Sequence, residues 1–164
     1  MNAPRPVPPR RKLPIGIQNL RQMREGGHYY VDKTGMAIDL IESGKSFFLS
    51  RPRRFGKSLL VDTMKALFEG ERALFTGLAA ETRWDWSRRH PVIRISFGGG
   101  VVSSEAGLVQ RIQHGLRGNF RALGLARADD IPFDDVAGHL ADLIERAHAA
   151  SGQQAVVLVD EYDK

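Results

Sequence analysis

Three short stretches of the chain are rich in apolar residues on neighbouring positions. Stretches of this length and composition are typical of strands that lie buried within a parallel sheet. They predict strands at 47–49, 92–97 and 155–159. Three glycines at 98–100 follow the second strand, where we expect only a flexible exit from the sheet.

Between these stretches, apolar residues recur three and four positions apart, which is the spacing of one face of a helix. The spacing predicts helices at about 57–69, 104–123 and 134–150, and a shorter helix that ends near Gly44. Strands and helices therefore alternate along the chain. This order predicts an α/β fold with a largely parallel sheet, flanking helices and right-handed crossovers.

Composition narrows the class of protein. With 164 residues, 42% of them hydrophobic, the chain is long enough for one domain with a buried core. Its apolar runs are far shorter than the roughly 18 residues that span a bilayer, so we expect a soluble protein without a membrane partner. The absence of cysteine excludes disulfides, thiolate nucleophiles and cysteine-ligated metals. No apolar segment typical of a secretory signal follows the N-terminus, and we therefore expect a cytoplasmic protein.

The net charge of +5 at pH 7 comes mostly from the first twelve residues. This segment holds four of the 24 basic residues and none of the 19 acidic ones, so the rest of the chain is nearly neutral. Its prolines keep it extended, which predicts a disordered basic arm at 1–12 and a folded domain at 13–164. The uneven distribution weakens the case for a nucleic-acid partner that the total charge suggests.

The clearest candidate chemistry follows the first predicted strand. Residues 50–60 have the sequence SRPRRFGKSLL, and its Gly56-Lys57-Ser58 is typical of the end of a phosphate-binding loop that opens a helix. The match is partial, because the pattern G-x-x-x-x-G-K-[ST] requires a glycine where this chain has Arg51. A basic turn that merely starts a helix is the alternative interpretation.

In the phosphate-loop interpretation, each residue has a separate task. Gly56 allows a backbone conformation that turns amide N–H groups toward phosphate oxygens, and the following helix adds its positive end. Lys57 reaches the β- and γ-phosphates, while the Ser58 hydroxyl is a ligand of Mg²⁺. The predicted nucleotide contacts are Arg54, Phe55, Gly56, Lys57, Ser58 and Leu59.

Two consecutive acids directly follow the last predicted strand. Because ligands of open α/β sheets bind beyond the carboxyl ends of the strands, Asp160 and Glu161 are expected beside the phosphate loop. Asp160 then holds Mg²⁺, and Glu161 orients and polarises the attacking water. Nucleotide kinases do not use a carboxylate in that second position, so the pair favours an NTP hydrolase with Lys57 and Glu161 as catalytic residues. A solvated strand end is the alternative.

Other basic residues carry weaker expectations. Arg51, Arg53 and Arg54 either contact phosphates or nucleic acid, or hold the loop by pairing with Asp160 or Asp163, and we favour the pairing. The five histidines have no spacing typical of a metal site. A non-catalytic nucleic-acid-binding module, built on the basic arm, these arginines and the loop lysine, is the alternative from another functional class. An inactive fragment is a third interpretation.

Several segments that cover most of the folded part resemble one family. They are LPIGIQNL (13–20), YYVDKT (29–34), FFLSRPRRFGKS (47–58), LFEGERALF (67–75), WDW (84–86), PVIRISF (91–97) and VVLVDEYDK (156–164). With these segments the chain resembles the bacterial and archaeal AAA-ATPase-like family. The family's own phosphate loop is similar to RPRRFGK-[ST], so Arg51 and Pro52 agree with it.

The resemblance implies an ATP-binding fold of the P-loop class. Gly56, Lys57 and Ser58 are then the phosphate and Mg²⁺ contacts. Asp160 is the second Mg²⁺ contact, and Glu161 is the hydrolytic base. The choice of ATP over another nucleoside triphosphate rests on the resemblance alone.

One matching motif has no assigned role. Tyr30, Asp32, Lys33 and Thr34 belong to the segment that resembles the family at 29–34. They either line the nucleotide pocket or brace the N-terminal segment against the sheet, and we favour bracing.

The resemblance also implies a longer protein. Relatives place a further strand, from sequence beyond the two acids, between the phosphate-loop strand and the acid-bearing strand. Many continue into a PD-(D/E)XK nuclease-like domain, through which nucleic acid would be bound. We therefore expect residues 1–164 to be an N-terminal fragment, truncated after the acid-bearing (Walker B) strand and poorly active by itself, with its oligomeric state open.

Overall fold

The computed structural model describes residues 11–52, 54–98 and 104–162 of the chain. Their sheet has two parallel strands, β1 (Val92–Ser96) and β2 (Val156–Asp160). The strands pair in register, so that Ser96 lies opposite Asp160 at the edge where both strands end. This arrangement confirms the α/β class, the two later strands and their parallel direction.

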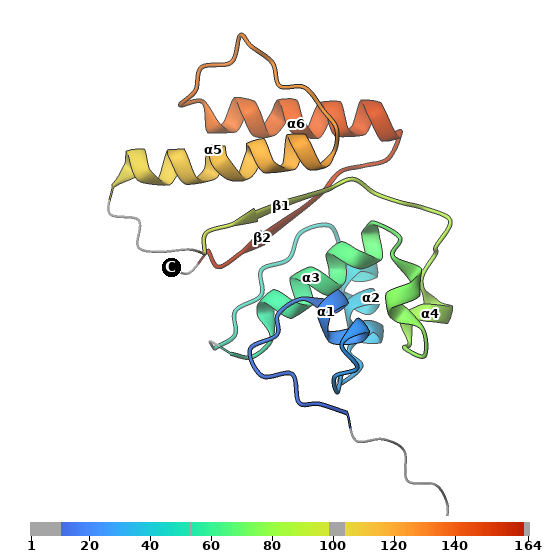
Figure 1. Cartoon of the computed structure of the whole chain (residues 1–164). Coiled ribbons are helices and arrows are strands. Elements are labelled where there is room, and N and C mark those ends of the chain that lie inside the picture. Colours follow the sequence, from blue (N-terminus) through green and yellow to red (C-terminus); the bar gives the residue numbers. More distant parts are fainter. Residues whose placement is uncertain (1–10, 53, 99–103, 163–164) are drawn as a thin grey trace, which may run out of the picture.

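Helices cover both faces of this small sheet (Figure 1). On one side, α5 (Glu105–Ala122) packs on β1, and α6 (Val136–Ser151) packs on α5. On the other side, α3 (Lys57–Phe68) packs against β2. The sheet is therefore the middle of three layers.

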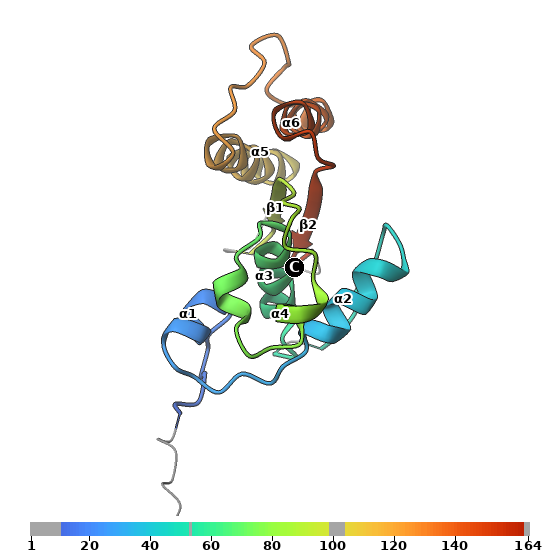
Figure 2. The same cartoon turned by 90° about the vertical axis from the view of Figure 1, so that its right-hand side faces the viewer.

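Several short elements complete the layer that contains α3. They are α1 (Leu20–Glu25), α2 (Thr34–Ser43), the 3-10 turn η1 (Arg72–Phe75) and α4 (Ala80–Arg83). Figure 2 shows α1 and α2 on either side of α3, and both helices contact it. No helix in the part of the chain that the structure describes combines the length and the apolar character needed to cross a membrane.

Each side of the sheet has its own apolar core. The core around α3 consists of Leu20, Ala37, Ile38, Ala66, Leu67, Leu74, Phe75 and Ala80. The core under α5 and α6 consists of Ile93, Ile95, Leu116, Phe120 and Leu143. The strand residues Ile93 and Ile95 belong to the core under α5 and α6, whereas the core around α3 is built from residues of the helices and η1.

The long helices begin and end where local capping chemistry predicts. Ser104 accepts a hydrogen bond from the amide of Gly107 at 3.1 Å, and Asp135 accepts one from the amide of Gly138 at 2.8 Å. Gly152 ends α6 in the left-handed conformation, with φ +66°. The helices expected at about 57–69, 104–123 and 134–150 are therefore confirmed to within about two residues.

The strand predicted at 47–49 is wrong. These residues have no regular secondary structure, and Phe47 and Phe48 are 46% and 75% exposed. A strand needs a neighbour that completes its backbone hydrogen bonds, and the described sheet has only β1 and β2. Leu49 nevertheless lies close to the end of β2, because the Tyr162 hydroxyl donates a hydrogen bond to its carbonyl oxygen at 2.9 Å.

Parts of three other expectations lie outside the described residues. The residues concerned are most of the basic arm, Arg53, Asp163 and the glycines at 99 and 100. At the start of the described chain, the Lys12 carbonyl accepts a hydrogen bond from the Tyr29 amide at 2.9 Å.

Candidate functional site

The loop before α3 has the backbone of an anion-binding turn. Arg54 and Gly56 both have positive φ, +68° and +78°, while Phe55 between them does not. Alternation of left-handed and ordinary residues turns neighbouring amide N–H groups to one side, where they form a cradle for an anion. A Cβ on Gly56 would meet nothing within 4 Å, so the backbone conformation, not crowding, favours glycine here.

The N-terminus of α3 opens directly onto this turn. Gly56 is the N-cap and makes no side-chain cap hydrogen bond. The first intrahelical bond among these residues runs from the Leu60 amide to the Gly56 carbonyl at 3.0 Å, so the amides of Lys57, Ser58 and Leu59 precede the helical ladder. These amides and the positive end of the helix are suited to bind a phosphate group.

The two predicted metal ligands meet in the structure. The Ser58 hydroxyl lies at the start of α3 and donates a hydrogen bond to Oδ1 of Asp160 at 3.2 Å. Asp160 is the last residue of β2 and is only 4% exposed. A hydroxyl beside a buried carboxylate is an oxygen pair of the kind that Mg²⁺ prefers.

Glu161 follows at a strained position beside the same loop. Its φ is +57°, an uncommon conformation for a residue with a side chain. Its side chain lies against Gly98, just after β1, where an added Cβ would overlap Oε2 of Glu161. Gly98 therefore leaves room for the Glu161 carboxylate, a role that the expectation of a mere flexible exit missed.

A cavity of about 760 Å³ connects these elements. It is lined by Pro14, Ile15, Gly16, Ile17, Gln18, Arg54, Gly56, Lys57, Ser58, Leu59 and Glu161. The loop, the start of α3 and the predicted hydrolytic base thus border one space. Phe55, another predicted nucleotide contact, is 63% exposed and does not line this cavity.

An arginine that the motif analysis did not select holds Asp160 in place. Arg94, in the middle of β1, donates from Nη2 to Oδ2 of Asp160 at 3.2 Å and from Nη1 to Oδ1 of Asp62 at 3.2 Å. Asp62 lies on α3, is 9% exposed and also accepts the Leu20 amide at 2.7 Å. One guanidinium therefore joins β1, β2, α3 and the start of α1.

At Asp160 this contact takes the place of the pairing that we expected from Arg51 or Arg54, whereas Arg53 and Asp163 lie outside the described residues. Neither Arg51 nor Arg54 forms an ion pair with a described carboxylate, whereas Arg94 pairs with Asp160. The sequence signal for Arg94 is a single charged residue inside an otherwise apolar strand. Asn119 on α5 fixes its backbone, since its side chain accepts from the Arg94 amide at 2.9 Å and donates to the Arg94 carbonyl at 2.8 Å.

Two of the four residues without an assigned role in the motif at 29–34, Asp32 and Thr34, form a brace between helices. Asp32 accepts hydrogen bonds from the amide of Thr34 at 2.9 Å and from the amide of Ala79 at 2.7 Å, and the Thr34 hydroxyl accepts the Ala80 amide at 3.0 Å. Burial acts to raise the pKa of Asp32, but the hydrogen bonds from Ala79 and Thr34 outweigh it, so that the pKa lies below its ordinary value. The brace joins α2 to α4 and does not reach the sheet.

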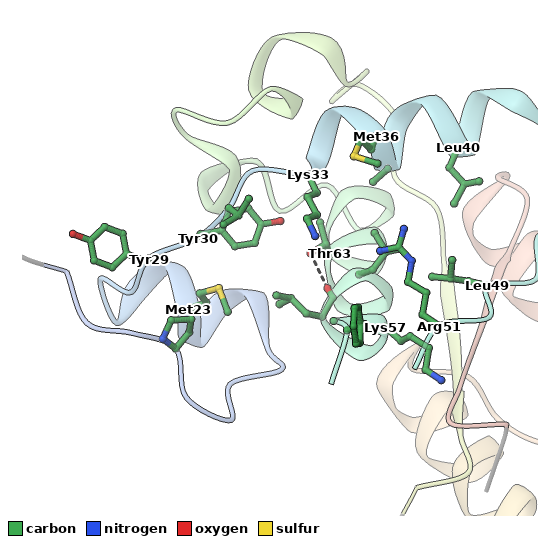
Figure 3. Close-up of a pocket in the computed structure, with 17 residues that line it drawn as sticks. Met23, Tyr29, Tyr30, Lys33, Met36, Leu40, Leu49, Arg51, Lys57 and Thr63 are labelled. Atoms are coloured by element: carbon green, nitrogen blue, oxygen red, sulfur yellow. Dashed lines mark hydrogen bonds between the residues drawn. The ribbon is translucent and has the colours of Figure 1, made fainter. Parts of the chain in front are cut away.

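The other half of the motif faces a second cavity. Tyr30 and Lys33 line a space of about 410 Å³ between α2 and α3 (Figure 3). Burial raises the pKa of the Tyr30 hydroxyl, and its hydrogen bond with the Thr63 hydroxyl opposes that effect. Asp32 and Thr34 therefore form a brace, while Tyr30 and Lys33 line a cavity. We had expected one role for all four residues.

The protein oxygens at this site would form part of a metal shell. Among residues 11–52, 54–98 and 104–162, no three His, Cys, Asp or Glu side chains gather as a metal site. Proteins commonly hold Mg²⁺ through one or two side chains together with phosphate oxygens and water, so Ser58 and Asp160 fit a nucleotide-bound Mg²⁺. The anion-binding turn beside them fits the phosphates.

Comparisons with known proteins give two matches. The family described as Predicted AAA-ATPase matches residues 14–164. An uncharacterized protein in the vnfD 5' region of Azotobacter chroococcum mcd 1 is 55% identical over 156 residues, which are 94% of this chain. The chain spans 30% of the length of that relative. No solved structure matches the chain.

Proposed function

Since the chain belongs to the predicted AAA-ATPase family, we propose that it forms the ATP- and Mg²⁺-binding part of a P-loop NTP hydrolase. One observation carries the proposal. The Ser58 hydroxyl, at the N-terminus of α3, lies 3.2 Å from the buried Asp160 carboxylate at the end of β2. A phosphate-binding turn and an acid-bearing strand end come together in this way where an NTPase needs them.

Each residue of the site has a task in this proposal. The amides at the start of α3 bind the phosphates, and Lys57 neutralises charge on the β- and γ-phosphates. Ser58 and Asp160 hold Mg²⁺, which polarises the phosphate oxygens when bound. Arg94 keeps Asp160 oriented toward the loop through its bond at 3.2 Å.

Glu161 is the proposed general base. It borders the same cavity as Lys57 and Ser58, and its carboxylate is placed by the open space at Gly98. From there it accepts a proton from the attacking water, whose oxygen bonds to the γ-phosphorus while the bond to the bridging oxygen breaks and ADP leaves. Phosphoryl transfer relies mainly on positioning and charge stabilisation, so the orientation of this carboxylate determines the rate of hydrolysis.

Binding and turnover of ATP by matched variants test the proposal. Lys57→Ala removes a charged contact to phosphate and should weaken Mg-ATP binding by about tenfold to a hundredfold. Lys45→Ala removes the same charge from an exposed position outside both cavities and should leave binding unchanged. Glu161→Gln should keep binding but stop hydrolysis. Equal binding by Lys57→Ala and the unaltered chain would refute the site, and normal turnover by Glu161→Gln would refute the base.

A further inference from the structure

The connection between α5 and α6 presents an aromatic side chain among acids. Residues 129–135, which we call the acidic loop, have the sequence DDIPFDD, with four acids and no base. Phe133 is 47% exposed, and the carboxylates of Asp129, Asp130 and Asp134 are exposed and form no ion pair with a described residue. Aromatic residues are enriched at protein interfaces, so this loop has the composition of a contact surface.

Helix α5 and the start of α6 hold this loop in place. Nε2 of Gln113 donates a hydrogen bond to the Phe133 carbonyl oxygen at 2.7 Å, and the Arg117 guanidinium lies 5.2 Å from the centroid of the Phe133 ring. Just before the loop, Nη2 of Arg127 lies 2.8 Å from Nε2 of the buried His139. The ring is therefore presented in a fixed position, which reduces the entropy that a contact with a partner would cost.

The cavity of about 410 Å³ between α2 and α3, which we call the α2 cavity, has the opposite charge. Its lining is mostly apolar and includes Lys33, Arg51 and Lys57 but no acid. Figure 3 shows Lys33 and Arg51 directed into this space. Tyr29 and Met36 also line it and are 50% and 63% exposed, so its apolar surface is open to a partner. Such a cavity fits an apolar side chain that is flanked by carboxylates.

The acidic loop and the α2 cavity of one molecule lie far from each other. Helices α5 and α6 cover one side of the sheet, whereas α2 packs on α3 on the other side (Figure 1). The loop, at the top of that view, extends away from the sheet. It can therefore meet an α2 cavity only on another copy of the chain. A contact between two different surfaces is heterologous, and it leaves one of each surface free at the ends of the assembly.

We propose that the chain self-associates head to tail, with the acidic loop of one copy docked in the α2 cavity of the next. Phe133 fills the apolar part of the cavity, and the carboxylates of the loop pair with the cations of Lys33 and Arg51 on the neighbouring copy. Because both surfaces remain available at the ends, association continues beyond a dimer. The contact uses no nucleotide, so it does not rest on the proposed ATP-binding function.

Sedimentation equilibrium of the unaltered chain, without nucleotide, measures this association. The average mass should rise with concentration and exceed that of a dimer. Raising the NaCl concentration from about 0.05 M to about 0.5 M should weaken the association several-fold, because salt screens charges at an exposed contact. Phe133→Glu removes the aromatic anchor, and Met36→Glu places an acid at the cavity. Each should weaken the association by about tenfold or more.

A mixture of these two variants separates a head-to-tail contact from other kinds of contact. Phe133→Glu keeps an intact α2 cavity, and Met36→Glu keeps an intact acidic loop. Each variant alone should be a monomer, while an equimolar mixture should form a 1:1 dimer that cannot extend, since only one loop and one cavity are functional. Formation of this dimer also shows that both variants are folded.

Matched controls change exposed residues outside the loop and the cavity. Leu108→Glu on α5 repeats the exchange of an exposed apolar residue for an acid and should associate like the unaltered chain. Lys33→Ala removes one cation of the cavity and should weaken the association several-fold. Lys45→Ala removes the same charge from an exposed position elsewhere and should have no effect.

Three results would overturn the inference. The first is an unaltered chain that remains monomeric at millimolar concentration. The second is association that persists in both Phe133→Glu and Met36→Glu, because the contact would then lie on another surface, such as the exposed valines of β2. The third is an equimolar mixture of the two variants that forms no dimer although the unaltered chain associates.

Discussion

Ser58 and Asp160 are 102 positions apart, yet the hydroxyl of the first donates to the carboxylate of the second at 3.2 Å. The contact exists because the first turn of α3 packs against the end of β2. It joins the proposed phosphate-binding turn to the acid-bearing strand although the strand expected at 47–49 does not form. The proposed site therefore depends on helix-to-sheet packing and not on a complete sheet.

Loss of Arg94 should destabilise the fold. Arg94→Ala leaves the carboxylates of Asp62 and Asp160, 9% and 4% exposed, without their shared counter-charge. Removing one partner of a buried ion pair costs about 3–5 kcal/mol, and the partial exposure of Arg94 reduces this to about 2–3 kcal/mol. Urea unfolding of the variant measures the loss.

A second substitution shows whether the uncompensated charge is the cause. In Arg94→Ala combined with Asp62→Asn, one of the two carboxylates is neutral, so part of the lost stability should return. A loss below about 1 kcal/mol in the single variant, or no recovery in the double variant, contradicts the role of Arg94 as the bridging charge.

Gly98→Ala should separate turnover from binding. The added methyl group occupies the space of the Glu161 carboxylate, which can swing away because it is the end of a flexible side chain. We expect ATP affinity and stability to change little, while hydrolysis falls by about tenfold or more, as for loss of a positioned base. Single-turnover hydrolysis, measured beside equilibrium binding, checks this. Gly118→Ala on α5, where an added Cβ meets nothing within 4 Å, is the control.

The brace at Asp32 should make stability depend on pH. Its pKa lies below the ordinary value, since hydrogen bonds from Ala79 and Thr34 outweigh the effect of burial. A carboxylate with a lowered folded-state pKa stabilises the fold above its unfolded pKa, and this contribution disappears as the pH falls through the folded value. Asp32→Asn should lower stability at neutral pH and flatten its fall between about pH 5 and pH 2. Equal pH profiles for Asp32→Asn and the exposed control Asp130→Asn would contradict the brace.

Local sequence signals predicted the helices and two of the strands. Caps such as Ser104 and Asp135 bond within three residues, so the chain near each helix end contains all the information needed. β1 and β2 were predictable because each is a short, mainly apolar run that is soon followed by glycines or by polar residues. Their shared register then brought Asp160 to the edge expected from the sequence.

The remaining features depend on contacts between distant residues. The stretch 47–49 is apolar enough for a strand, but strand formation requires a partner that the stretch itself cannot supply. Arg94 pairs with Asp62 and Asp160, 32 and 66 positions away, and no local pattern specifies such partners. Gly98 accommodates a side chain from a different strand end, and this role depends on the pairing of β1 with β2.

Deletion of residues 1–12 tests the rival nucleic-acid function. Binding to a phosphate backbone falls steeply as salt rises, and it should weaken further when the basic arm is removed. The proposed ATP site uses no residue of the arm, so ATP affinity should be the same with and without it. Nucleic-acid binding that needs the arm, in a chain that binds no ATP, would favour the rival.

The dependence of ATP affinity on Mg²⁺ tests the central claim, that Ser58 and Asp160 form a nucleotide-bound metal site. Calorimetric titration of the full chain should give about tenfold tighter ATP binding with Mg²⁺ than with chelator, because the hydroxyl of such a loop ligates the metal. Ser58→Ala should lose this gain and keep the metal-free affinity, whereas Ser46→Ala, an exposed serine outside both cavities, should retain the gain. The same gain in Ser58→Ala as in the unaltered chain would contradict the account.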